Sequence, residues 1–179
     1  MDEDNLNNQD VINLAENPSI DNKSLIAEKI TALYNSPHIT PILAKLSEDI
    51  FRIMIKDTEI KVRQALASCL KNCSYLPLDI IENILNDNDS VAIPFIQYYE
   101  ALTDDDLIKI INSQNPNRQK AISLRHNISY NLSDYIVNNC SQNIISTLIS
   151  NEGASIKETT FNTIISKYPD DENIKNLCS

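Results

Sequence analysis

The stretch that decides the fold class is Asp57-Thr-Glu-Ile-Lys-Val62-Arg63-Gln-Ala65-Leu66-Ala67-Ser-Cys69-Leu70. Its apolar residues recur at intervals of three and four, which is the spacing of an amphipathic helix. Small alanine and cysteine side chains stand among valine and leucine, which indicates close packing against neighbouring elements. We therefore predict a packed helix that follows an acidic loop.

This pattern of a loop and a helix start recurs along the chain. The positions that align lie 29, 27 and 26 residues apart; they are Val62, Val91, Arg118 and Ile144. A second helix is predicted after each of them, in the ranges 77–86, 103–112, 131–138 and 155–168. Thr103 and Ser155 are predicted to cap two of these helices, because each is followed three residues later by an acidic residue. Gly153 stands where a helix stop is expected.

A helix-turn-helix unit that recurs every 26 to 29 residues is typical of an α-solenoid, in which stacked units share one core. The sequence therefore predicts an all-α fold, an α-solenoid of short HEAT-like repeats, over residues 23–179 as a single domain. An irregular helical bundle is the alternative. Residues 1–22 contain six acidic residues and no Lys or Arg, and we expect a partly flexible arm there. Such an arm could also dock on the chain's own groove or on a basic partner.

The first long helix with a clear start follows Thr40-Pro41, an N-cap followed by a proline at the first helical position. Its apolar stripe is expected to join the shared core of the stacked units. The stripe consists of Ile42, Leu46, Ile50, Ile53 and Met54.

Composition excludes several classes of protein. The 179 residues include one glycine, and the net charge is −10. Glycine-rich phosphate loops are therefore ruled out, and the acidic balance argues against nucleic acid as a partner. No stretch is long and apolar enough for a transmembrane helix, and the start of the chain lacks the basic and apolar parts of a secretory signal. We expect a cytoplasmic protein that does not insert into a membrane.

Metal and catalytic motifs are weak in this chain. Cys69 and Cys73 could neighbour each other on a helix, but a closed zinc site needs about four ligands. Asp87-Asn-Asp89 resembles the start of a calcium loop that lacks the later glycine and glutamate. His126 could be an acid/base residue, although a structural role is the simpler interpretation. We predict no cofactor, no metal, no catalytic residues and no enzymatic activity.

Two arginines in apolar helical contexts are predicted to tie one repeat to the next through carboxylates. The candidate inter-repeat ion pairs involve Asp57, Arg63, Asp87, Asp89, Asp106 and Arg125. The alternative is an anion-binding site.

Tyrosines are the candidate partner-binding residues, because exposed tyrosines are favoured at interaction hot spots. Adjacent residues on a helix point about 100° apart, so one side chain of a tyrosine pair is expected to reach the surface. The candidates are Tyr98, Tyr99, Tyr130 and Tyr135.

The order of several stretches resembles a bacterial family known only as domain of unknown function 2336. The stretches are Val62-Arg63-Gln-Ala-Leu-Ala67, Asp89-Ser-Val-Ala-Ile-Pro94, Leu102-Thr-Asp-Asp-Asp-Leu-Ile108, Gln119-Lys-Ala-Ile-Ser-Leu-Arg125 and Asn151-Glu-Gly-Ala-Ser155. The resemblance covers roughly residues 14–168. It implies a HEAT-like fold, and it implies no catalytic residue, cofactor or partner.

The sequence leaves more than one function open. The leading hypothesis is a non-catalytic protein interaction or scaffold module that binds a basic or amphipathic partner. The alternative is a small-molecule or signalling sensor with Arg125 and His126 in an interhelical pocket. Self-association is a third possibility that the sequence leaves open.

Overall fold

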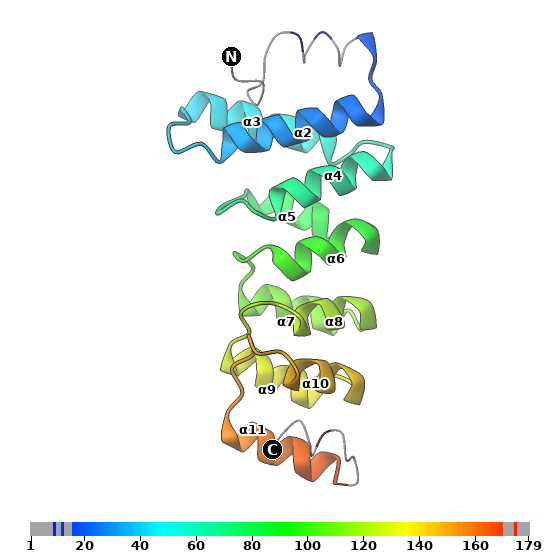
Figure 1. Ribbon diagram of the computed structural model, residues 1–179, viewed down its shortest axis with the longest axis vertical. Coiled ribbons are helices and arrows are strands. Elements are labelled where there is room, and N and C mark those ends of the chain that lie inside the picture. The colour runs from blue at the N-terminus through cyan, green and yellow to red at the C-terminus, as the bar shows by residue number, and fades with distance from the viewer. Residues whose placement is uncertain (1–8, 10–11, 13–15, 170–173, 175–179) are drawn as a thin grey trace. The chain divides into compact units, whose positions relative to one another are not determined.

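The structure of the protein is a computed structural model in which residues 9, 12, 16–169 and 174 are described (Figure 1). The regular elements within these residues are α-helices, so the predicted all-α class is confirmed. They are α2 (Ile20–Tyr34), α3 (Pro41–Met54), α4 (Ile60–Leu70), α5 (Leu78–Leu85), α6 (Asp89–Tyr98), α7 (Asp104–Asn112), α8 (Pro116–Ser123), α9 (Tyr130–Asn139), α10 (Gln142–Ile149) and α11 (Glu158–Lys167).

The chain divides into two compact units, Met1–Phe95 and Ile96–Ser179, and the boundary falls within α6. A single repeat domain over residues 23–179 and a continuous solenoid therefore stay predictions. Most of the predicted acidic arm, residues 1–22, lies outside the described residues. The last residues of that range belong to α2, which begins at Ile20.

In the first unit, α2 packs against both α3 and α4, and α3 also contacts α4. Thr40 caps α3 by accepting a hydrogen bond from the backbone N–H of Leu43, and Pro41 takes the first helical position as the sequence indicates. Phe51 of α3 is fully buried in this unit. Its ring meets the ring of Tyr34 edge-on, with the two centroids 5.4 Å apart.

In the second unit, helices two places apart in the chain pack against each other. The helix α9 contacts both α7 and α11, and α8 contacts α10, so the unit contains two rows of helices (Figure 1). A regular spacing of 26 residues underlies these rows. Ile96, Ile122 and Leu148 lie at this spacing, and all three are fully buried. The short end of the predicted range of 26 to 29 residues therefore describes this unit.

The loop after α8 and the loop after α10 are joined by backbone hydrogen bonds. Ile128 donates to the carbonyl of Gly153, and its own carbonyl accepts from the N–H of Ser155. Ser155 is thus not the N-cap of α11, as the sequence predicted, because its backbone belongs to this bridge. The N-cap is Lys157, which makes no side-chain cap hydrogen bond. The capping box of Thr103 and Asp106 on α7 is present as predicted.

Candidate interaction surface

The outer face of α3 carries large aliphatic side chains that no other part of the described chain covers. Ile42, Leu46 and Ile53 are 80 %, 54 % and 72 % exposed. With about 100° per residue, these three positions fall within about 40° of one another around the helix axis. We call Ile42, Leu46 and Ile53 the α3 stripe. The sequence-based expectation that these residues enter the core is wrong.

The reason lies in the second apolar side of the same helix. Phe51 and Met54 are buried together with Ser47, and they occupy the side of α3 that faces its neighbours. A single helix of a small unit cannot bury both sides against the same neighbours. The presence of apolar residues on two sides of one helix is the signal that could have identified the stripe.

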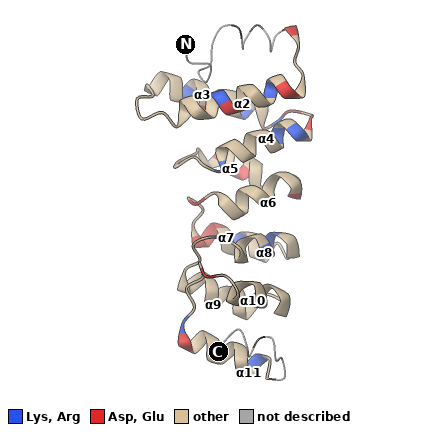
Figure 2. Ribbon diagram, viewed as in Figure 1, with Lys and Arg blue, Asp and Glu red and all other residues tan. Residues whose placement is uncertain are grey.

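Charged residues of both signs border the α3 stripe. Lys45 and Asp49 lie one turn apart on α3, with 2.9 Å between Nζ and Oδ1, and both side chains are largely exposed. Arg52 follows and donates to both carboxylate oxygens of Asp79 on α5, at 2.6 and 3.1 Å. Figure 2 shows charged residues of both signs on the helices of this unit. The border of the stripe is therefore charge-balanced rather than basic or acidic.

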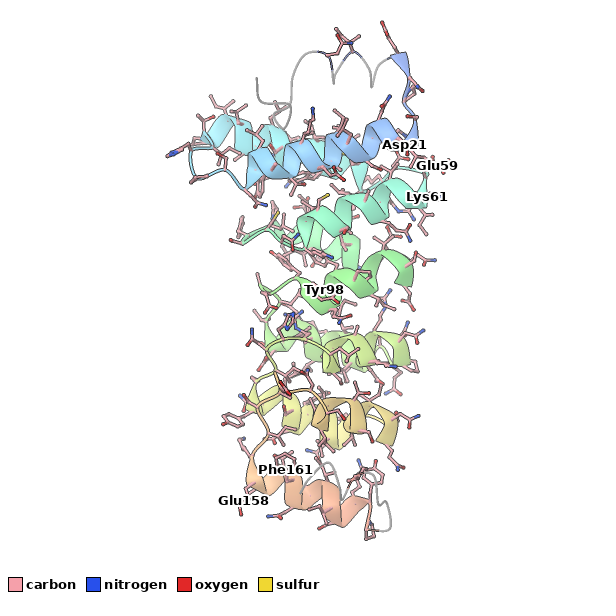
Figure 3. All side chains as sticks on the ribbon, viewed as in Figure 1. Asp21, Glu59, Lys61, Tyr98, Glu158 and Phe161 are labelled. Carbon is pink, nitrogen blue, oxygen red and sulfur yellow. The ribbon has the colours of Figure 1, made fainter. Side chains whose placement is uncertain are left out.

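The predicted tyrosine pair divides between surface and core. Tyr98, which is labelled in Figure 3, lies at the end of α6. Its side chain is 42 % exposed, whereas that of Tyr99 is 1 % exposed. The ring of Tyr98 lies 6.4 Å from the ring of His126, centroid to centroid. Tyr99 is therefore not a surface residue, because the backbone rotation between adjacent residues turns its side chain into the core of the second unit.

The other two candidate tyrosines both belong to α9. Tyr130 is exposed at the start of the helix, with the ammonium group of Lys157 6.0 Å from its ring centroid. Tyr135 is half-buried, and its hydroxyl donates to the side-chain oxygen of Asn112 at 2.8 Å. The three candidates that are at least partly exposed, Tyr98, Tyr130 and Tyr135, therefore each contact a different residue.

Arg63 and Asp87, two of the residues predicted to form ion pairs, form a bidentate pair between guanidinium and carboxylate. The distances are 2.6 Å from Nε and 3.0 Å from Nη2 to the two carboxylate oxygens, and both side chains are mostly buried. The Nη1 of Arg63 also donates to the carbonyl of Asp57 at 2.8 Å. This arginine thereby links the start of α4 to the loop before α6. The hydrogen bonds from Arg63 lower the pKa of Asp87 below its ordinary value.

Replacing Arg63 with alanine is expected to reduce the free energy of unfolding by about 1–3 kcal/mol at neutral pH. Because the folded-state pKa of Asp87 is lowered, the stabilisation is present above the unfolded-state value of about 4 and is lost as the pH falls through the folded-state pKa. The difference between wild type and variant should therefore shrink in acid. Urea unfolding across pH measures this, with Lys61→Ala on the exposed side of α4 as control. A difference that stays constant with pH would contradict the assignment.

Two of the remaining acidic candidates, Asp57 and Asp106, have other partners. The carboxylate of Asp57 pairs with Lys23 of α2 at 2.6 Å, not with Arg63. Asp106 accepts hydrogen bonds from Thr103 and lies 3.7 Å from Lys109, so it serves its own helix rather than an inter-repeat pair. Asp89 lies in the first turn of α6. Arg52, which the sequence did not single out, makes the bidentate contact with Asp79 instead.

Arg125 does not pair closely with a carboxylate. It is 2 % exposed, and its guanidinium donates to the backbone carbonyls of Ile96 and Tyr99, the latter at 3.0 Å. The carboxylate of Glu100 lies 4.0 Å away. Burial lowers the pKa of Arg125 below its ordinary value. The hydrogen bonds of Arg125 thus go to the carbonyls at the end of α6, and its contact with a carboxylate is the 4.0 Å ion pair with Glu100.

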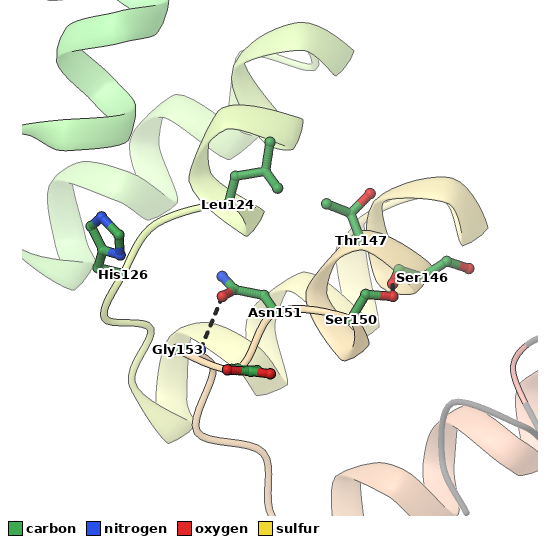
Figure 4. Close-up of a pocket in the computed structure, with 8 residues that line it drawn as sticks. Leu124, His126, Ser146, Thr147, Ser150, Asn151 and Gly153 are labelled. Carbon is green, nitrogen blue, oxygen red and sulfur yellow. Dashed lines mark hydrogen bonds between the residues drawn. The ribbon is translucent and has the colours of Figure 1, made fainter.

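His126 lines an open hollow of about 660 Å³ between the loops after α8 and α10 (Figure 4). Most of the residues that line it carry polar side chains, and the hydroxyls of Thr147 and Ser150 donate to carbonyls of their own helix. Asn151 donates to the carbonyls of Ser123 and Arg125, and its side-chain oxygen accepts from Gly153. Asn151 therefore serves the loop structure.

The three described cysteines are free thiols. Burial raises the pKa of Cys73 to about 11, and it also raises the pKa values of Cys69 and Cys140. Such thiols stay protonated at neutral pH, which makes them poor nucleophiles. Within the described residues, no group of three or more His, Cys, Asp or Glu side chains is arranged to hold a metal ion.

The second half of the chain is similar to a known bacterial family. Residues 91–178 match the family described as "Uncharacterised protein conserved in bacteria (DUF2336)". The match supports the resemblance inferred from the sequence over this part of the chain, and the HEAT-like repeats that the resemblance implies stay a prediction. No curated protein and no solved structure matched the chain. None of the described helices combines the length and the apolar character needed to cross a membrane.

Proposed function

We propose that the chain is a non-catalytic protein interaction module of HEAT-like helical repeats that acts in the bacterial cytoplasm. The α3 stripe carries this proposal. Three aliphatic side chains at helical spacing stand in water on one face of a helix, with Leu43 exposed beside them. Contiguous exposed apolar surface of this kind marks docking sites, whereas single exposed leucines and isoleucines are ordinary.

The energetics favour an occupant for this face. Covering apolar surface releases roughly 25 cal/mol for each Å² removed from water. Terminal repeats of helical arrays need a polar outer face to remain soluble, and α3 belongs to the first pair of described helices without having one. A second helix with its own apolar side would complete the packing, in the way that helices bind apolar grooves elsewhere.

The sensor alternative receives less support. It requires the guanidinium of Arg125 to reach a ligand, but this group is buried and engaged with backbone carbonyls. The hollow beside His126 is open, and Asn151 on its wall uses both of its amide donors on backbone carbonyls. Thr147, Ser150 and Asn151 on this wall thus already use their side-chain donors within the protein.

Replacing Ile53 with glutamate is expected to abolish binding of the module to its partner. A charge within a dry apolar contact costs roughly ten-fold to several-hundred-fold in affinity. The experiment is affinity capture of tagged wild type and Ile53→Glu from bacterial lysate, read by quantitative mass spectrometry. Any protein bound by wild type and lost by the variant, a second copy of the chain included, supports the proposal.

The matched control is Leu78→Glu, which introduces the same charge at a 65 % exposed apolar position of the same unit. Both variants should retain the wild-type circular dichroism spectrum and melting temperature. If both lose the same partner, or if neither loses one, the α3 stripe is not the docking surface.

A further inference from the structure

The occupant of the α3 stripe can be inferred from the positions of its residues. We propose that the stripe binds α3 of a second copy of the chain, antiparallel, to form a symmetric dimer. This inference rests on the proposed function, because it names the partner of the same surface.

The first argument is the symmetry of the stripe about the middle of α3. Ile42 and Ile53 lie at equal distances along the helix from the midpoint between Ser47 and Glu48. In an antiparallel pair that crosses at this midpoint, Ile42 of the first copy therefore lies opposite Ile53 of the second copy. By symmetry, Ile53 of the first copy lies opposite Ile42 of the second. Two-fold dimers require such a self-complementary surface. The two isoleucines are also the most exposed aliphatic side chains of the helix, so each gains burial by the pairing.

The second argument is charge. Lys45 and Asp49 lie along the same edge of the α3 stripe. In the antiparallel pair, the two-fold axis places this edge of one chain beside the same edge of the second chain. Lys45 of one chain then falls within about 1.5 Å, measured along the helix axis, of Asp49 of the other. Each dimer gains two such opposite-charge contacts. In a parallel two-fold pair this edge of one copy would lie on the opposite side of the contact from the same edge of the other. The two opposite-charge contacts would then not form, so the antiparallel arrangement is favoured.

The same charges disfavour other occupants. A strongly basic helix would meet Lys45 and the guanidinium of Arg52, and a strongly acidic helix would meet Asp49 and Asp79. The side chains of Lys45 and Asp49 are 64 % and 51 % exposed, so both are accessible to a partner. A partner with one lysine and one aspartate at the same spacing, in reverse order, fits this border, and α3 itself is such a helix.

The test uses analytical ultracentrifugation of the full chain and three variants. Wild type should dimerise, and Ile53→Glu should sediment as a monomer with unchanged helix content. Lys45→Glu places two acidic residues on each border and Asp49→Lys places two basic residues there. Each of these two variants should weaken the dimer by about tenfold or more through like-charge contacts.

An equimolar mixture of Lys45→Glu and Asp49→Lys should restore association, because an acidic border then meets a basic one. The double variant Lys45→Glu with Asp49→Lys should dimerise like wild type. A merely structural effect of either residue on its own helix would not be rescued by mixing, so this result is specific to the proposed pair.

A monomeric wild type up to high concentration would overturn the dimer. If Ile53→Glu then still loses a different captured protein, the proposed function stands without it; if nothing is lost, both fail. A wild type that dimerises only after removal of residues 1–16 would show that the chain's own N-terminal segment occupies the stripe, which also overturns the proposal. A dimer that Ile53→Glu leaves intact would place the interface elsewhere.

Discussion

Replacing Arg125 with alanine is expected to lower the free energy of unfolding of the second unit by about 3–5 kcal/mol. The guanidinium is buried and donates to the carbonyls of Ile96 and Tyr99. Its removal leaves two buried acceptors without donors, at about 1–3 kcal/mol each, and it leaves a cavity in the core as well. Urea unfolding followed by circular dichroism at neutral pH measures the change.

Arg125→Lys separates charge from geometry. A lysine keeps the positive charge, but its single ammonium group lacks the planar fork that reaches two carbonyls. We expect it to recover only part of the loss. Lys120→Ala, on the exposed side of α8, is the control and should change stability by less than about 0.5 kcal/mol. An Arg125→Ala variant as stable as this control would show that the buried guanidinium is not needed.

Replacing Gly153 with alanine is expected to cost about 2–4 kcal/mol and to separate the loops after α8 and α10. A Cβ atom at this position would lie 2.0 Å from the carbonyl oxygen of His126, which is backbone and cannot turn aside. The φ angle of Gly153 is not positive, so the requirement is space rather than backbone conformation. The hydrogen bonds between Ile128 and the loop after α10 would break as the backbones move apart.

The loss of the hydrogen bonds between the two loops can be measured by hydrogen exchange at individual backbone amides. Hydrogen exchange of the amides of Ile128 and Ser155, which form the bridge between the loops, should accelerate strongly in Gly153→Ala. The control is Glu152→Ala at the neighbouring exposed position, where both stability and exchange should remain as in wild type. Equal protection of these two amides in both variants would refute the steric argument.

The amino-acid sequence by itself determined the helical class and much of the helix order. The period of the apolar residues and the caps at Thr40 and Thr103 act within one turn of the chain, so they can be read without knowing what packs where. For Tyr98 and Tyr99 the sequence predicted only that one of the two would reach the surface, and the structure decided that it is Tyr98.

Contacts between residues far apart in the sequence could not be predicted in the same way. The sequence shows which groups are present but not the distances between them. Arg125 was predicted to hydrogen-bond to a carboxylate. Its hydrogen bonds go to backbone carbonyls at the end of α6, and the carboxylate of Glu100 lies farther away, at 4.0 Å. Gly153 was predicted to end a helix, but the approach of the His126 backbone explains it better.

The α3 stripe shows most clearly what only the tertiary structure decided. Helical periodicity indicates which residues share a face, and Ile42, Leu46 and Ile53 do share one. Whether a face is covered depends on how many neighbours the helix has and on which side they lie. In this unit α2 and α4 take the side of Phe51 and Met54, so a pattern that is typical of a core remains exposed to solvent.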